Sequence, residues 1–580
     1  MTTLQRSRSN LALVRVALGA VAVLLFEPAA LAQCVAASNG PHINTDQRKP
    51  FQVNVDSAAT ITGLDGSGSA VNWTAAQLAN GASAAAALVN EQANAGWYEY
   101  TGSTSNTLAT VQSFTEAQCI TNGVQSIVHF TDNCKGSLGQ AFAICGGTRF
   151  VIEVSMRGPA PACANTRTLN NGTITSGAQD LVTVLAHELI HALNIGHPAA
   201  GVSATVGPTG ARGRQLYQYD LECTAGTAGS LSGFREQEAT RRDVTSSGAT
   251  VTIGSRYAVK SAVAKVAAGW TDVTGGWAWL SAYQGSSAGE WDLNANGTTV
   301  AMPLVDETAG VGLVPGAFRE VAGYEHVLFS SPVDDTGQTD PNSRHQLMAT
   351  YSTNNFSGSI LTAMRQCTTM TGPMQCSSPN RTDIFTSGRV AVGYLADIGR
   401  TVLAWSSQDR SSTNASANSE LVKVAVGSVD SSAGLIVPVP TSMGRRTSVP
   451  PALACYEDGI DGYDCILFYV PAEDDAYQLS SRRFSVTWNA GSNRYTLTWE
   501  PNPRQVPAYT GNPVAAWYMT SSSRVYVAYR DLGVGNPLKA ISSADGITWT
   551  VVGSTLGDII SGPSAASMWR GDSNILMYVR

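Results

Sequence analysis

Strand-like segments recur six times in the C-terminal two-thirds of the chain, between about residues 232 and 580. In each repeat a first strand ends in a small residue followed by an aromatic residue or Met. A polar loop then leads to a second strand rich in aromatic and branched residues. The first strands end at Trp270, Tyr324, Tyr394, Tyr456, Tyr518 and Met568. The second strands cover Trp277–Tyr283, His345–Tyr351, Arg400–Ser406, Asp464–Val470, Ser523–Arg530 and Ser573–Arg580. Each repeat has room for four short strands, so the pattern predicts six similar sheets.

Six such sheets arranged around an axis form a six-bladed β-propeller. The chain ends after the second strand of the sixth repeat, so we expect its outer strands to come from about residues 245–253. The segment Ser543–Trp549 resembles the Asp-box of sialidase-type propellers, a structural turn between the outer strands of a blade. Gly and Asp supply the geometry of such a turn. A pair of β-sandwiches is the alternative that the pattern leaves open.

Residues 33–231 follow a different pattern. Phe51–Val55 alternates like a strand, and Ser126–Phe130 and Arg149–Val154 are branched and apolar, as strands are. Thr74–Gln92 is rich in Ala and Leu and favours a helix despite Gly81. A second helix follows, so this segment is predicted to be one α+β domain. The chain is therefore expected to be multidomain, with an α+β domain at 33–231 and an all-β domain at 232–580.

The first 32 residues resemble a secretory signal peptide. Arg6, Arg8 and Arg15 precede the apolar run Val16–Phe26, and Ala30–Ala32 supplies the small residues of a cleavage site. The run is too short for a stable membrane anchor, and no later stretch approaches the length of a membrane span. A membrane-tethering helix is the alternative. We expect an exported protein, either secreted or periplasmic.

Composition limits the class of partner. The 580 residues are 43% hydrophobic and only 14% charged, which excludes wholesale disorder, and their length requires at least two domains. The 36 basic and 43 acidic side chains give a formal charge of -7. Removal of the leader takes away three Arg and one Glu, which leaves 33 basic against 42 acidic side chains, or -9. No basic surface remains for a polyanion, so we expect no nucleic-acid partner.

The ten cysteines are an even set, as in disulfide-bonded exported proteins. Six lie before about residue 230 and four after it, so each predicted domain can pair its own. Cys367/Cys376 and Cys455/Cys465 are close enough in sequence to bridge hairpins. No cysteine lies in a CxxC motif, which gives no support to a cysteine-ligated zinc ribbon.

The most specific chemistry lies in residues 181–197, which read LVTVLAHELIHALNIGH. Ser176–Gln179 has the form of a capping box that starts a helix. His187 and His191 are four residues apart, so both imidazoles project from one face and can share a tetrahedral zinc ion. Glu188 is placed to take a proton from a zinc-bound water. With 7 His in the chain, a chance HExxH is expected only about 10⁻³ times.

His197 is the best candidate for a third metal ligand. Asn194 and Gly196 tolerate left-handed backbone and provide the reversal that would bring His197 back to the ion. The motif HExxHxxNxxH resembles the signature of the metzincin zinc peptidases, in which the turn residue is usually Gly. The resemblance implies a zinc endopeptidase whose edge strand aligns the substrate, and Arg149–Val154 is the candidate for that strand.

The metzincin Met-turn has no clear counterpart. Met348 is either that turn or, as we prefer, a strand residue of the second propeller repeat. Leu216–Asp220 is a local substitute that lacks Met, and its Tyr219 is a candidate metal-side tyrosine. Other third ligands remain open: Glu222, Glu236 and Glu238, of which the last two lie in a segment of helical composition, and the remote His326 and His345.

Acidic clusters in Gly-containing loops are weak candidates for Ca²⁺: Asp334, Asp335 and Asp340, and Asp458, Asp461 and Asp464. The main functional hypothesis is a secreted zinc endopeptidase acting on protein or peptide substrates, with His187, His191 and His197 as ligands and Glu188 as general base. The alternative is a secreted binding or adhesion protein whose propeller binds a protein or glycan and whose zinc is structural. A propeller glycosidase is a further rival.

Overall fold

The computed structural model describes most of both predicted domains. Described are residues 34–37, 49–56, 61–65, 68–92, 98–135, 137, 139–157, 163–164, 167–168, 179–198, 216, 219–220, 223, 237–244, 250–259, 266–273, 276–284, 291–295, 298–302, 314–321, 324–331, 346–352, 361–362, 364–367, 386, 389–395, 397–407, 421–430, 434–438, 440–472, 474, 476–534, 537–552, 559, 563–567 and 574–579. The predicted signal peptide lies outside the described residues. Within them, no helix is long and apolar enough to cross a bilayer.

A five-stranded sheet forms the centre of the N-terminal domain. Its order is β4 (Tyr98–Ser103), β1 (Lys49–Val55), β5 (Ser126–Thr131), β7 (Arg149–Ser155) and β6 (Gly139–Ile144). Neighbouring strands run parallel, except that β6 is antiparallel to β7. A smaller sheet contains β2 (Ile61–Leu64), β3 (Ala70–Trp73), β8 (Arg167–Thr168) and β9 (Gln179–Asp180). The three strands predicted from the sequence are confirmed.

The predicted edge strand is wrong. Arg149–Val154 belongs to β7, which lies inside the sheet with β5 on one side and β6 on the other. The segment before it folds back through the short 3-10 turn Cys145–Gly147 and pairs with it as a hairpin. Two antiparallel strands can be joined by only a few residues. Because β6 pairs with β7 in this way, β6 takes the edge position that the sequence pattern assigned to β7.

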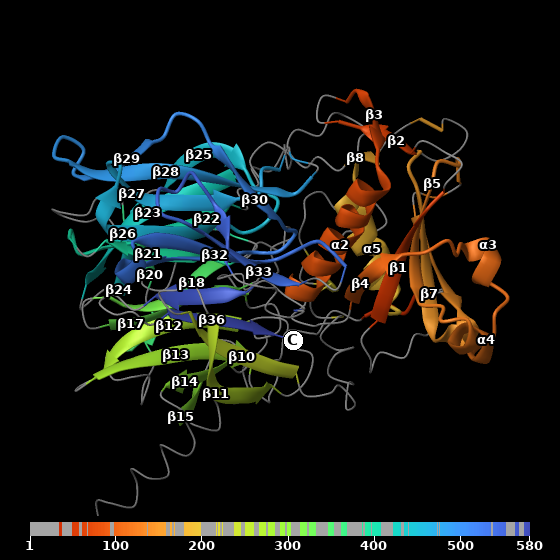
Figure 1. The fold of residues 1–580 in the computed structure, drawn as a ribbon, viewed down its shortest axis with the longest axis horizontal. Coiled ribbons are helices and arrows are strands. Elements are labelled where there is room, and N and C mark those ends of the chain that lie inside the picture. Colours follow the sequence, from red (N-terminus) through yellow and green to blue (C-terminus); the bar gives the residue numbers. More distant parts are fainter. Residues whose placement is uncertain are drawn as a thin grey trace, which may run out of the picture.

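Helices α2 (Ala75–Gln92) and α5 (Leu181–His191) cover one face of the sheet and lie between it and the β domain (Figure 1). The helix predicted at 74–92 is therefore confirmed. Alternate residues of the strands, such as Phe51, Val53 and Ile152, are buried beneath these helices. Many small Ala side chains let α2 approach other elements closely, and a Cβ added to Gly511 of the β domain would lie 3.0 Å from Ala84. The two domains share one continuous hydrophobic core.

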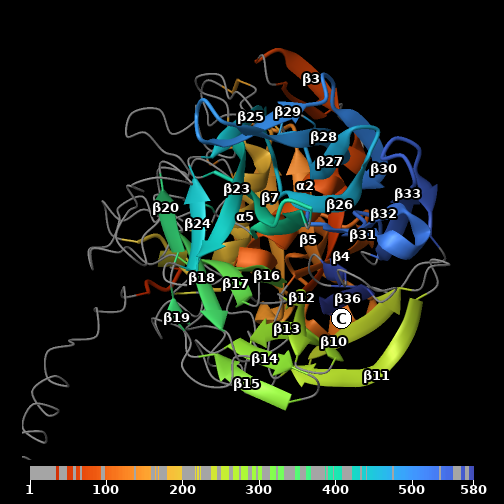
Figure 2. The same ribbon diagram turned by 90° about the vertical axis from the view of Figure 1, so that its left-hand side faces the viewer.

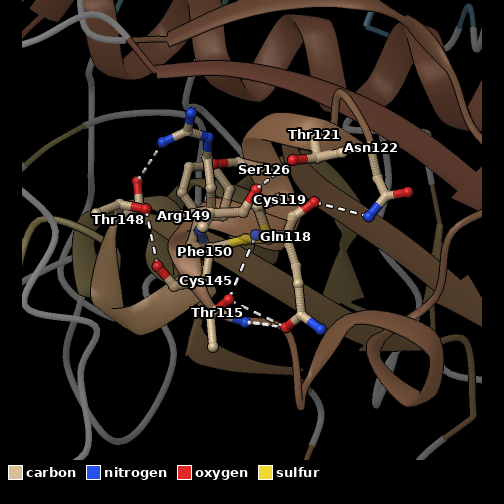
Figure 3. Close-up of a disulfide and its surroundings, with 11 residues drawn as sticks. Thr115, Gln118, Cys119, Thr121, Asn122, Ser126, Cys145, Thr148, Arg149 and Phe150 are labelled. Carbon is tan, nitrogen blue, oxygen red and sulfur yellow. Dashed lines mark hydrogen bonds between the residues drawn. A yellow bond between two sulfur atoms is a disulfide. The ribbon is translucent and has the colours of Figure 1, made fainter.

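A disulfide joins two segments that pack on the opposite face of the sheet. Helices α3 (Leu108–Val111) and α4 (Glu116–Thr121) pack there over Ile127 and Val151. Figure 3 shows Cys119 of α4 joined to Cys145 of the 3-10 turn. Cys34–Cys223 and Cys134–Cys163 complete the pairing of the first six cysteines within the N-terminal domain. The predicted hairpin bridge Cys455–Cys465 is confirmed, whereas Cys376 lies outside the described residues.

Loss of the Cys119–Cys145 disulfide should destabilise the N-terminal domain by about 3 kcal/mol. The bond closes a loop with a sequence separation of 26, and its removal leaves that loop free in the unfolded chain. The test is urea denaturation of a Cys119→Ser/Cys145→Ser variant beside wild type. An unchanged denaturation midpoint would show that the packing of α4 alone fixes this corner.

The described residues of the β domain form six blades, whose innermost strands lie near a common axis (Figure 2). The blades make five hydrogen-bonded sheets, because β12 pairs with β16 and joins the first two blades into one eight-stranded sheet. The innermost strands are β12 (Val266–Val273), β16 (Val314–Val321), β21 (Ala391–Leu395), β26 (Ala452–Ile460), β31 (Ala515–Met519) and β35 (Ser564–Ser567). Each contacts the next one in this order, and β35 contacts β12, so the six strands close a ring. A closed ring of antiparallel sheets is a β-propeller.

The second strands of the blades are β13 (Gly276–Gln284), β17 (Tyr324–Ser331), β22 (Arg400–Ser406), β27 (Tyr463–Tyr469), β32 (Arg524–Arg530) and β36 (Asn574–Val579). Five of them coincide closely with the predicted second strands. In the second repeat the prediction is wrong by one strand. Tyr324 starts β17 instead of ending the first strand, and the predicted second strand His345–Tyr351 lies largely in β18 (Gln346–Ser352), which is the third strand. Only Ala322 and Gly323 separate these two strands in the sequence, so there is no polar loop there, and the sequence pattern missed the first hairpin of this blade.

The chain closes its ring with strands from ahead of the first repeat, as predicted, although they cover 237–244 and 250–259 rather than 245–253. β10 (Gln237–Val244) pairs with β36, and β11 (Thr250–Val259) pairs with β10. The prediction that the segment around Glu236 and Glu238 is helical is wrong, because Glu238 lies in β10 and pairs with Ala258. The pairing of β10 with strands on both sides overrides the helical preference of its residues.

The predicted Asp-box turn is confirmed between the outer strands β33 (Leu538–Ser543) and β34 (Thr550–Val551). The Asp545 carboxylate accepts hydrogen bonds from the backbone N–H groups of Ile547 and Thr548, at 2.8 and 2.7 Å. Gly546 has φ +70°, and a Cβ there would lie 2.5 Å from Ile466. Trp549 packs edge-on against a neighbouring blade at Phe468, with ring centroids 5.6 Å apart. The turn is a structural link between blades.

Candidate metal centre

Helix α5 starts later than the sequence predicted. Its N-cap is Asp180, whose carboxylate accepts a hydrogen bond from Thr183 N at 2.9 Å and from the Thr183 hydroxyl at 2.8 Å. This corrects the predicted capping box at Ser176–Gln179, because Gln179 and Asp180 form β9 and pair with β8. Most of α5 is buried, and only Val184, His187 and His191, which share one side of the helix, are half-buried.

The predicted reversal after α5 is present. Asn194 has φ +64°, in the left-handed region that Asn tolerates. The helix ends in a tight turn in which Asn194 N donates to His191 O at 2.9 Å. The chain then runs back beside the helix end, and this places His197 next to the two helical histidines.

The three imidazoles converge. Nε2 of His197 lies 3.1 Å from Nε2 of His191 and 3.4 Å from Nε2 of His187. A tetrahedral zinc ion with Zn–N bonds of about 2.0–2.1 Å holds its ligand nitrogens roughly 3.3 Å apart. In the part of the chain that the structure describes, these histidines are the one group of His, Cys, Asp and Glu side chains close enough to share a metal ion. The arrangement fits zinc.

The protonation of His191 also suits a metal ligand. Its Nδ1 lies 2.8 Å from the carbonyl oxygen of Ile195, to which it can donate its proton. Nε2 is then free of a proton and faces the other two imidazoles, as in many metal sites where a carbonyl orients the ligand. Burial lowers the pKa of His191, with His197 contributing, although the bond to Ile195 acts to raise it. Burial also lowers the pKa of His197. Both shifts favour the neutral form that binds zinc.

Glu188 follows His187 in α5 and lies against β6. It is buried, and a Cβ added to Gly139 would lie 2.6 Å from its Oε1. Gly139, at the start of β6, therefore leaves space for the Glu188 side chain. The sequence around Gly139 carries no signal for this role, because nothing in its pattern shows which helix Gly139 would face.

A segment at the start of the described chain completes the surroundings of the centre. Ala36 forms a β-bridge with Ile195, and Ala37 N donates to Asn194 O at 3.2 Å. Tyr219, the candidate metal-side tyrosine, donates its hydroxyl to Gly196 O at 3.1 Å. The hydroxyl also accepts from Val35 N, at 3.1 Å. Tyr219 is thus bonded to backbone, and the structure gives it a supporting position rather than a place on the metal.

The other candidate ligands lie elsewhere. Met348 is in β18, where it pairs with Phe329, so it is a propeller strand residue and forms no turn beneath the histidines. His326 is in β17 and Glu238 in β10, both in the propeller. Glu222, Glu236 and His345 lie outside the described residues.

The candidate calcium loops are only partly described. Asp461 lies 3.2 Å from Arg483, and Asp464 accepts a hydrogen bond from Val486 N at 2.6 Å. Both carboxylates therefore have partners within the protein. Asp458 is in β26, while Asp334, Asp335 and Asp340 lie outside the described residues. A calcium site remains a prediction.

A buried histidine outside the metal centre lies on the face of the N-terminal sheet opposite α2 and α5. His129 of β5 is 2.6 Å from the side-chain oxygen of Asn54 on β1 and 4.0 Å from Glu153 on β7. Burial lowers the pKa of His129, although Glu153 and Asp56 act to raise it; Lys135 also lowers it. The folded protein therefore disfavours the protonated imidazole.

Acidification should destabilise the protein through His129. The unfolded chain binds this proton at a pKa of about 6.5, so stability is expected to fall as the pH drops through that value toward the lowered folded pKa. The measurement is urea denaturation in chelator at pH 7.5 and pH 5.5, for wild type and His129→Gln. Between pH 7.5 and pH 5.5 the variant should lose less stability than wild type. An equal loss in both proteins would show that other groups take up the proton.

Known structures resemble this chain only weakly. No family model matches the chain, and neither does any curated protein. A fucose-specific lectin from Aleuria aurantia, described as a six-bladed β-propeller, is 10% identical over 54% of this chain and 87% of its own, with a TM-score of 0.32. A puromycin-hydrolysing peptidase from Mycobacterium tuberculosis is 10% identical over 57% of this chain and 49% of its own, with a TM-score of 0.31. An α-L-arabinofuranosidase from Lactobacillus brevis is 10% identical over 46% and 83%, with a TM-score of 0.28. These are likenesses of fold.

These comparisons overturn the prediction of a zinc metalloendopeptidase. The similar structures include a fucose-specific lectin and several glycoside hydrolases. None of the proteins named above is described as a zinc peptidase. The general-base role predicted for Glu188 belonged to that activity and is set aside with it. The metzincin resemblance stays a sequence prediction.

Proposed function

We propose that the chain is an exported binding protein, in which the propeller holds a glycan and the N-terminal domain carries a structural zinc ion. His187, His191 and His197 are the proposed ligands. The observation that carries the proposal is the convergence of their Nε2 atoms, with separations of 3.1 and 3.4 Å. Zinc there would join the end of α5 to the returning segment 195–197, in the way that structural zinc sites hold separate segments together.

Export is supported by the covalent structure. Disulfides are typical of proteins that fold outside the reducing cytosol, and four are present among the described residues. Domain boundaries at 33–231 and 232–580 and cleavage of a leader after Ala32 are parts of the same proposal. N-terminal sequencing of the exported protein should start at Gln33.

An exposed aromatic surface on the fourth blade supports a binding role for the propeller. Trp488 of β28 (Gln478–Asn489) is 40% exposed and pairs across the sheet with Tyr495 of β29 (Arg494–Trp499). The two rings meet edge to face at 5.0 Å, and the guanidinium of Arg400 lies 5.5 Å from the Tyr495 ring. Trp, Tyr and Arg are the side chains that most often dominate binding surfaces. An exposed indole ring can also stack on the apolar face of a sugar.

Zinc content tests the metal centre. The purified exported protein should contain one zinc ion per chain by inductively coupled plasma mass spectrometry. His191→Ala should reduce zinc to background, whereas His129→Ala, a buried histidine outside the centre, should retain it. A zinc-free wild type that cannot be reloaded would contradict the metal part of the proposal.

A glycan array tests the propeller. Trp488→Ala should weaken glycan binding at least tenfold, and Tyr509→Ala, which removes another exposed aromatic side chain (43% exposed), serves as the matched control. If the protein bound a protein ligand but no glycan, the proposed ligand class would be wrong. Chelator-sensitive cleavage of casein would contradict the binding-protein proposal itself.

A further inference from the structure

The backbone next to the third histidine is held on both sides. Gly196 N donates to the carbonyl oxygen of Val35 at 2.6 Å, and Gly196 O accepts from the Tyr219 hydroxyl at 3.1 Å. The same hydroxyl accepts from Val35 N at 3.1 Å, so Val35 and Tyr219 also bind each other. Both polar groups of the residue that precedes His197 are therefore satisfied by two segments distant in sequence.

A disulfide joins those two segments. Cys34 directly precedes Val35, and Cys223 follows Tyr219 by four residues; the Cys34–Cys223 bond has a sequence separation of 189. Cys223 is buried, whereas Cys34 is exposed. The bond thus ties the segment 34–37 to the body of the domain at the point where it contacts the turn after α5.

The fit between the segment 34–37 and the turn is tight. A Cβ added to Gly196 would lie 2.7 Å from Ala36 O and 3.1 Å from Val35 O, both of which are backbone atoms. The His197 side chain is mostly exposed, and its ring lies against those of His187 and His191. Its position therefore depends on the backbone of Gly196, and through it on the clamped segment.

We propose that the Cys34–Cys223 disulfide is a positioning element of the metal centre, which sets zinc affinity by holding the turn that carries His197. The proposal rests on the zinc site proposed above. Without the bond, the segment 34–37 would depend on the hydrogen bonds of Val35 and Ala37 and on the β-bridge of Ala36. Its departure would release Gly196 and let the third imidazole move away from the other two. Partners that orient a metal ligand typically contribute 10–100-fold to metal affinity.

The experiment compares two disulfide deletions. Zinc affinity is measured by competition with a chromophoric chelator for wild type, Cys34→Ser/Cys223→Ser and the matched control Cys455→Ser/Cys465→Ser, whose bond lies in the propeller. The Cys34/Cys223 variant should bind zinc 10–100-fold more weakly, and the control should stay within twofold of wild type. The visible absorption of the Co²⁺-substituted proteins should change only in the first variant, as a third nitrogen ligand is lost.

Each outcome decides the proposal. Equal affinities in all three proteins, or equal weakening in both variants, would overturn it while leaving the zinc site intact. A wild type that binds neither Zn²⁺ nor Co²⁺ would refute the zinc site itself. Should the Cys34/Cys223 variant fail to fold, Tyr219→Phe replaces it, because that change removes only the hydroxyl that bonds Gly196 and Val35. Tyr219→Phe is expected to weaken zinc binding about tenfold and to alter the Co²⁺ spectrum in the same direction, and unchanged affinity there would overturn the proposal.

Discussion

Replacement of Arg483 by Met is expected to lower the free energy of unfolding by about 3–5 kcal/mol, because it removes one partner of a buried ion pair. Arg483 donates to both carboxylate oxygens of Glu500, at 3.0 and 3.2 Å, and each side chain is only 6% exposed. Its guanidinium also donates to the Asp545 carbonyl at 3.3 Å and lies 4.6 Å from the Tyr463 ring. The side chain thus connects strands of the fourth blade with the Asp-box turn of the fifth.

Arg494→Met is the matched control, since Arg494 is an exposed residue of the same blade. Denaturant midpoints at neutral pH give the comparison, and similar losses in both variants would show that Glu500 is sufficiently neutralised by Arg504 alone.

The ion pair of Arg483 and Glu500 also makes a contribution to stability that depends on acid pH. Burial alone would raise the pKa of Glu500, but the bonds to Arg483 and Arg504 outweigh it and lower that pKa. Stability is therefore lost as the pH falls below about 4.5 and through the lowered folded pKa, and Arg483→Met should lose less there.

The features that the sequence predicted correctly share a local cause. The reversal at Asn194 depends on one residue that tolerates left-handed backbone, and φ +64° there is what the HExxHxxNxxH spacing requires. The Asp-box depends on Asp545 bonding backbone groups two and three residues away. The propeller repeat could be recognised because four of its innermost strands, β12, β21, β26 and β31, contain one of the predicted aromatic residues and because its second strands are strongly apolar.

The features that were missed depend on contacts distant in sequence. Whether β7 is an edge strand is decided by β6, and whether the residues around Glu238 form helix or strand is decided by pairing with β36, more than 300 residues later. The support of His197 is of the same kind. Val35 and Tyr219 are 184 residues apart, and their meeting at Gly196 has no signature in a single sequence. The even cysteine count indicated pairing but could not say that Cys34 joins Cys223.

Removal of zinc is expected to lower the free energy of unfolding by about 4 kcal/mol, for free zinc held a thousandfold above its dissociation constant. The ion would bind the folded chain far better than the unfolded one, because only the folded turn at Asn194 brings His197 to within 3.1 and 3.4 Å of the other two Nε2 atoms. Melting temperatures with and without a chelator measure the effect, which should increase with zinc concentration. His191→Ala should melt at one temperature under both conditions, whereas His129→Ala should keep the full difference. If wild type and His191→Ala responded equally to the chelator, the stabilising ion would lie elsewhere, and the three converging histidines would not be its ligands.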